Sequence, residues 1–200
     1  MDVLEKIMRA AGLSGMCQAN FIPTKDLTFY PEIRKICEGN ACRNYARTWA
    51  CPPATGTLEE CQKRLLKYDT LLLFSNKYEI EDCFDIEGMR AALLAFKRGV
   101  DLFHNGLNAF LSDFLLLSNE GCARCEKCTY PGAPCRFPGL LHHSIEGYAL
   151  NIGELANLAG IRYNNGPNTV TYFGGLAFRA AARAARLICA HPNPLSAARK

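Results

Sequence analysis

Apolar residues recur every three or four positions in three stretches of the chain, as expected for helices with one buried face. These stretches predict helices over residues 1–13, 86–112 and 144–159. Pro31 suits the first turn of a further helix over residues 32–37. Another expected helix begins at Thr57, because Thr57 and Glu60 match a capping box, in which a hydroxyl and a carboxylate bind free backbone amides.

Short apolar runs between these helices predict buried strands. They cover residues 70–75 and 114–117, and a β-prone run predicts a third strand over residues 169–173. Residues 17–30 are typical of a short hairpin or an irregular strand. The pattern indicates the α/β class, with a small sheet flanked by helices.

The length of the chain fits one domain. Two hundred residues with 49% hydrophobic content are enough to bury a single core. We therefore expect one compact domain over residues 1–178, followed by a basic tail rich in alanine and arginine over residues 179–200.

Charge and hydropathy exclude two classes of function. The excess positive charge behind the net +4 collects in the tail, and no basic stripe with interleaved aromatic residues is visible elsewhere. A nucleic-acid partner is therefore not expected. No apolar stretch approaches the roughly 20 residues that span a bilayer, and residues 1–13 lack the continuous apolar core of a signal peptide. The sequence predicts no membrane segment.

Eleven cysteines are the unusual feature of the composition. An odd number of cysteines without a secretion signal argues against a complete disulfide framework. Thiolates that bind metal in a reducing cytoplasm explain them better. Most of these cysteines fall into two groups, which we expect to form two cysteine-rich metal-binding loops.

The second group is the more informative of the two. Cys122, Cys125 and Cys128 are separated by gaps of two residues, a spacing that wraps three sulfurs around one face of a 4Fe-4S cluster. Cys135 is the natural fourth ligand, since prolines and a glycine before it turn the chain back. Zinc sites also use cysteine pairs with this gap, but zinc ribbons normally bring two separated pairs, so three successive cysteines favour iron and sulfide. Buried structural thiols are the remaining alternative.

The first group consists of Cys37, Cys42 and Cys51, and it lacks an obvious fourth ligand for a second metal centre. The candidates for that ligand are Cys61, Cys17, Cys83, His142 and His143. Without a fourth protein ligand, one iron would stay open to a substrate, as open coordination positions mark catalytic metal sites. A closed site completed by Cys61, and cysteines that serve only packing, are the other interpretations.

Several short motifs together indicate a known family. They are Cys37, Cys42, Asn44-Tyr45, Trp49 to Pro53, Tyr68, Cys122, Cys125, Cys128, Cys135-Arg136, Pro138, Glu146-Gly147 and Asn168 to Phe173. With these residues the chain resembles, over most of its length, the predicted metal-binding protein family catalogued as domain of unknown function 2284. The resemblance implies metal binding, commonly suspected to be iron–sulfur chemistry, and no agreed reaction.

These observations lead to one functional prediction and two rivals. We expect a cytoplasmic iron–sulfur protein with one 4Fe-4S cluster on the second group, and room for another on the first, that transfers electrons to a partner redox protein. The enzymatic rival binds a small substrate at an open iron of the first group. The structural rival is a binding module held together by zinc on Cys122, Cys125, Cys128 and Cys135.

Overall fold

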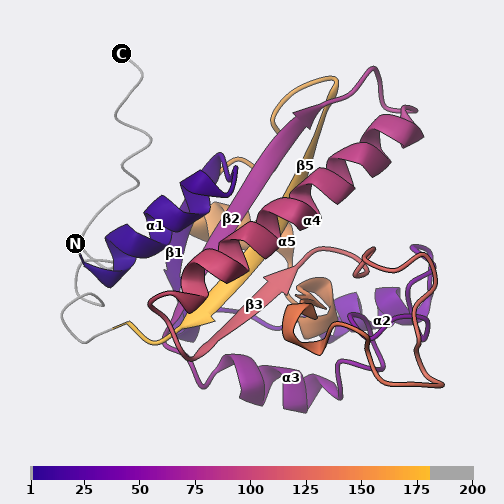
Figure 1. Ribbon diagram of the computed structural model, residues 1–200, viewed down its shortest axis with the longest axis horizontal. Helices are drawn as coiled ribbons and strands as arrows, with labels where there is room; N and C mark the ends of the chain where they lie inside the picture. Colours follow the sequence, from indigo (N-terminus) through magenta and orange to yellow (C-terminus); the bar gives the residue numbers. More distant parts are fainter. Residues whose placement is uncertain (1, 181–200) are drawn as a thin grey trace.

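The computed structural model describes residues 2–180, in which five strands form one mixed sheet in the order β1-β2-β5-β3-β4 (Figure 1). The strands are β1 (Gln18–Pro23), β2 (Thr70–Glu79), β3 (Phe114–Ser118), β4 (His143–Ser144) and β5 (Thr169–Phe178). Only β3 and β4 pair in parallel, and every other pair is antiparallel. The expected α/β class is confirmed.

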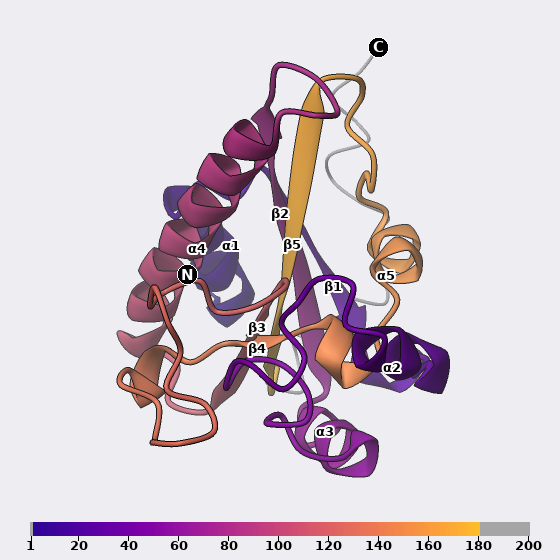
Figure 2. The same ribbon diagram turned by 90° about the vertical axis from the view of Figure 1, so that its right-hand side faces the viewer.

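Two helices cover one face of the sheet, α1 (Val3–Leu13) and α4 (Ile86–Asn108) (Figure 2). Their apolar stripes meet the sheet in a core that includes the fully buried Ile7, Phe96 and Phe103. This is the burial that the helical spacing of apolar residues predicts. No helix within residues 2–180 is both long and apolar enough to cross a membrane.

Shorter helices cover the opposite face (Figure 2). They are α2 (Pro31–Glu38), α3 (Leu58–Leu65), α5 (Ile152–Ala159) and the 3-10 turn η3 (Glu146–Tyr148). Two further 3-10 turns are η1 (Thr24–Asp26) and η2 (Pro138–Leu140). Leu65 and Tyr148 are fully buried here, so the sheet has an apolar core on each side.

Most expected elements are confirmed within a few residues. The predicted capping box of α3 is formed, since the Thr57 hydroxyl accepts from the Glu60 amide and the Glu60 carboxylate accepts from Thr57. The helix expected over residues 86–112 ends at Asn108, because the chain must turn to begin β3 at Phe114. Residues 181–200, most of the expected basic tail, lie outside the described part.

The helix expected over residues 144–159 is wrong in its first half. Ser144 belongs to β4, and Ala149 has the left-handed backbone φ of 58°, which stops a right-handed helix. The helix α5 starts at Ile152, where the Asn151 side chain caps it. The apolar spacing misled because η3 and α5 are separate segments that bury their apolar residues in the same core.

Gly174 in β5 gives a prediction about the sheet. A Cβ at Gly174 would collide with the Phe74 ring and would lie 2.9 Å from the Leu117 carbonyl oxygen. We expect Gly174→Ala to lower the free energy of unfolding by about 1–3 kcal/mol, because overpacking forces side chains and backbone to shift. Urea unfolding of the two chains measures this.

The matched control for this prediction is Gly12→Ala in α1. A Cβ at Gly12 meets nothing within 4 Å. In a helix, alanine instead of glycine stabilises by about 0.5–1 kcal/mol. Equal stability of the Gly174→Ala chain and the unchanged chain would contradict the close packing of Phe74 on β5.

Candidate metal centre

The two cysteine loops, residues 39–57 and 119–142, pack against each other at one end of the molecule (Figure 1, lower right). The Trp49 ring nitrogen donates to the Ala133 carbonyl at 3.2 Å, and the ring meets Tyr130 edge-on with centroids 4.9 Å apart. A Cβ at Gly121 would lie 2.5 Å from the Asn44 amide oxygen, so a larger residue there would displace the Asn44 side chain. Groups more than sixty residues apart in sequence are thus neighbours.

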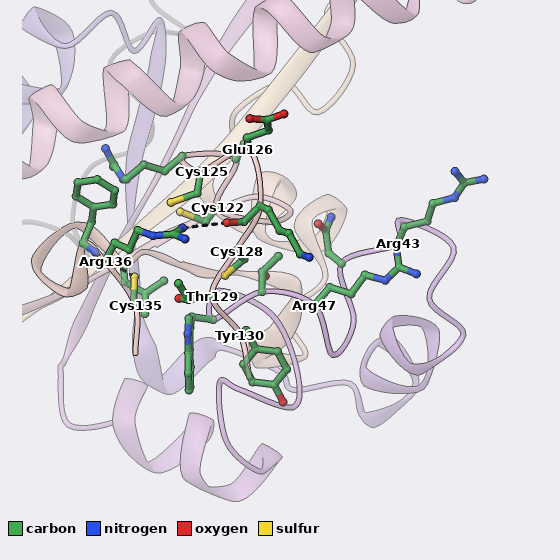
Figure 3. Close-up of a pocket in the computed structure, with 18 of the residues that line it drawn as sticks. Arg43, Arg47, Cys122, Cys125, Glu126, Cys128, Thr129, Tyr130, Cys135 and Arg136 are labelled. Carbon is green, nitrogen blue, oxygen red and sulfur yellow. Dashed lines mark hydrogen bonds between the residues drawn. The ribbon is translucent and has the colours of Figure 1, made fainter. Parts of the chain in front are cut away.

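The four cysteines of the second loop all line one pocket of about 750 Å³ (Figure 3). Cys122, Cys125, Cys128 and Cys135 are half-buried, so each thiol is partly open to the pocket. The loop begins directly after β3, as the sequence predicted. Its fourth cysteine therefore faces the same space as the first three.

Cationic side chains dominate the pocket wall. They are Arg43 and Arg47 from the first loop, Arg90 from α4, and Arg124, Lys127 and Arg136 from the second loop, against one carboxylate, Glu126. Within residues 2–180, no ion pair is formed by Arg43, Arg47 or Arg90. The pocket is therefore suited to an anionic occupant.

The second loop is fixed to α4 by one ion pair. The Arg124 guanidinium lies 2.5 Å from the Asp101 carboxylate, and it also lies over the Phe137 ring at 5.7 Å. Arg136 donates to the Lys127 carbonyl at 3.0 Å across the turn of the loop (Figure 3). These contacts hold the ends of the cysteine run near each other.

The cysteines of the first group lie within electrostatic reach of one another. Burial, together with the negative charges of Glu146, Cys51 and Cys42, raises the pKa of Cys37 to about 11. Burial likewise raises the pKa of Cys51. A bound metal would have to displace these protons, since thiolates are the ligands, so metal affinity at this group should fall at low pH.

The residues that the sequence offered as a fourth ligand for this group either form other hydrogen bonds or lie in other parts of the fold. Cys61 is fully buried in the core, where its sulfur donates to the Thr55 carbonyl at 3.4 Å. His142 is hydrogen bonded to His104 at 3.0 Å, and His143 to the Tyr148 hydroxyl at 3.2 Å. Cys17 precedes β1, and Cys83 lies exposed between β2 and α4.

No three His, Cys, Asp or Glu side chains within residues 2–180 lie close enough together to hold one metal ion as they stand. The ten cysteines of this part are all free thiols. The donor set nevertheless suits iron and sulfide, because thiolates are their usual ligands and the surrounding cations offset the negative charge. Binding would draw the loop thiols inward, as metal binding commonly orders its own ligands.

Two buried charges at this end of the molecule were not predicted from the sequence. The Lys97 ammonium of α4 donates to the Ser118 hydroxyl at 3.0 Å and to the Asn119 carbonyl. Burial lowers the pKa of Lys97 to about 8, although the charges of Glu146 and Cys122 raise it. Lys97 therefore lies within electrostatic reach of both cysteine groups.

Glu146 of η3 is the second of these charges, and burial raises its pKa. Its only signal in the sequence was its place in the Glu146-Gly147 motif. Nothing in the local pattern shows that the charges of Lys97 and Glu146 act on each other, because α4 and η3 are far apart in the sequence.

Comparison with known proteins adds the family. The model of the family described as predicted metal-binding protein (DUF2284) matches residues 20–178, which include both cysteine loops and all of the sheet except the first two residues of β1. The chain belongs to this family. No curated protein and no solved structure matches the chain. The resemblance noted in the sequence is confirmed, and this DUF2284 protein is assigned to metal binding at the level that the family description states.

Proposed function

We propose that this DUF2284 protein is an iron–sulfur protein that carries a 4Fe-4S cluster on Cys122, Cys125, Cys128 and Cys135. The observation that supports this proposal most strongly is the shared pocket, which all four thiols line together with six cationic side chains. A cluster held by four thiolates is an anion, and positive charge around it stabilises its reduced form. A zinc ion on four thiolates is also an anion, but zinc has no reduced form for these cations to stabilise.

Electron transfer is the proposed role of this cluster. Because the four cysteines are half-buried, a cluster bound to them would lie near the surface, within reach of a redox partner protein. The exposed Arg43, Arg47 and Arg136 form a basic rim around it, which favours an acidic partner surface and speeds the encounter. The cytoplasm is the proposed compartment, since free thiols persist where disulfides are reduced.

Metal and sulfide analysis of protein purified without oxygen tests the proposal. We expect a brown protein with broad absorption near about 400 nm and about four irons, or about eight with a second cluster, matched by equal acid-labile sulfide. A colourless protein with stoichiometric zinc and no sulfide would support the zinc-stabilised binding module and rule out the iron–sulfur proposal.

An enzyme is the second candidate function. The pocket of about 750 Å³ lies in the range of small-molecule sites. Arg43, Arg47 and Arg90 form no ion pair in the described part of the chain, so they could bind an anionic substrate. In this function an iron on Cys37, Cys42 and Cys51 would supply an open position for the substrate, beside a pocket that these three cysteines do not line. A small anion that changes the EPR signal of the reduced protein would favour the enzyme, and an unchanged signal across a panel of carboxylates and phosphates would favour the carrier.

A further inference from the structure

Three segments that are distant in sequence meet beside the first cysteine group. Arg34 of α2 donates to the Gly147 carbonyl of η3, and Cys37 follows Arg34 by one helical turn on the same face. The Ser144 amide donates to the Ala50 carbonyl at 2.8 Å, which places Cys51 beside the chain that leads into η3. The helix α2, the first loop and η3 therefore surround one small region.

Glu120 links the cysteine to the glutamate in this region. The Cys51 sulfur lies 3.6 Å from the Glu120 carbonyl oxygen, and the Glu120 amide hydrogen bonds to the Glu146 carboxyl group. The charges of Cys51, Cys42 and Glu146 all act on Cys37. Three thiols and one carboxylate are thus collected within electrostatic reach of one another.

The Glu146 carboxylate has an oxygen with no partner. Its Oε2 atom is buried, and no hydrogen-bond donor reaches it within residues 2–180. The nearest cation identified, the Lys97 ammonium, is already bound to Ser118 and Asn119. A buried carboxylate oxygen without a donor or a cation costs free energy, and a bound cation would offset that cost.

We propose that Glu146 is the fourth protein ligand of a metal centre whose other ligands are Cys37, Cys42 and Cys51. The metal is iron in a sulfide cluster, and the carboxylate holds the iron that no cysteine reaches. Oxygen is a weaker ligand than thiolate for this metal, so that iron exchanges its ligand more readily than the other irons. The proposal names the missing ligand, and it is independent of the cluster on Cys122, Cys125, Cys128 and Cys135.

Metal analysis of four full-length variants tests this assignment. Each substitution is made in the unchanged chain and in the Cys122→Ala, Cys125→Ala chain. The second chain should bind no iron on the second loop, so the iron measured there belongs to the first group. After gel filtration with a chelator, we expect the first group of the Glu146→Gln variant to retain at most one tenth of the iron that it retains with Glu146. Glu146→Cys should keep the iron and change the EPR signal of the reduced cluster, because a thiolate replaces an oxygen ligand.

The matched controls are Glu120→Gln, an exposed carboxylate beside the site, and Cys61→Ala. Both should keep the iron of the first group. Full iron with an unchanged EPR signal in Glu146→Gln would overturn the proposal, and loss of iron only in Cys61→Ala would assign the ligand to Cys61. Circular dichroism identifies a variant that fails to fold, and in that case the Glu146→Cys spectrum alone decides, since an unchanged signal there also overturns the proposal.

Discussion

The double variant Cys122→Ala, Cys125→Ala is expected to lose the entire cluster of the second loop, about four irons and four sulfides per chain. Two thiolates remain in this variant, and two cannot hold a cubane that four normally hold. Absorbance, iron and sulfide measured on protein purified without oxygen give the result. The fold should persist, because the loop lies outside the sheet and both apolar cores.

The matched control is Cys17→Ala, Cys83→Ala, which removes two exposed thiols outside both groups. It should keep all the iron and sulfide. Undiminished iron in the Cys122→Ala, Cys125→Ala chain would show that the second loop is not the cluster site. Equal loss in both double variants would point to a general effect of thiol removal instead.

Loss of the cluster would also change the charge balance of the pocket. Without the anionic cluster, the positive charges of the pocket repel one another with fewer thiolates nearby. The ion pair of Arg124 with Asp101 offsets part of that positive charge within the protein itself. The cations from the first loop and from α4 have no such partner within residues 2–180.

The elements with a local signal could be predicted from the sequence. The capping box at Thr57 marks the start of α3, because the interaction spans only three residues. The runs at residues 70–75 and 114–117 mark the buried centres of β2 and β3, where both faces of the strand are covered. The spacing of Cys122, Cys125 and Cys128 likewise identified a loop whose thiols share one pocket.

The ends of the strands could not be predicted in this way. Beyond Ser75, β2 continues to Glu79 with alternating exposed and partly buried residues, held only by pairing with β5. Gly174 and Gly175 weaken the strand signal of β5, yet they are required where Phe74 and Leu71 pack against the strand. Whether these residues belong to a strand depends on the strands that pair with them, and the pattern of one strand contains no information about its partners.

The residues of the candidate site other than the cysteines could not be predicted either, because long-range contacts bring them to the site. Glu146 was expected inside a long helix, where a glutamate is an ordinary surface residue. The left-handed Ala149 ends η3 and separates it from α5, and the parallel pairing of β4 with β3 then brings η3 to the cysteine loops. The search for a fourth ligand therefore included cysteines and histidines but missed the buried carboxylate.

Acidification from pH 7.5 to pH 4.5 is expected to lower the free energy of unfolding by about 5 kcal/mol through two histidines, the buried His142 and the partly buried His143. Burial lowers the pKa of His142 to about 3 and that of His143 to about 4, with the charges of His104 and Lys97 adding to the shift for His142, and that of Arg64 for His143. In the unfolded chain both pKa values return to about 6.5, so the unfolded state binds more protons below that pH. The stability is thus complete above pH 6.5 and is lost as the pH falls toward the folded pKa values. Urea unfolding at the two pH values measures the change.

Glutamine at both positions separates the histidines from other acid effects. The variant His142→Gln, His143→Gln cannot take up these protons, so its stability should change much less between the two pH values, even if it is lower at pH 7.5. Metal release at low pH would destabilise both chains alike, because the cysteines are unchanged. An equal loss of stability in both chains would therefore assign the acid sensitivity to the metal sites. The same loss of about 5 kcal/mol approaches the total stability of many domains, so neutral histidines beside the cysteine loops would set the lower pH limit of the fold.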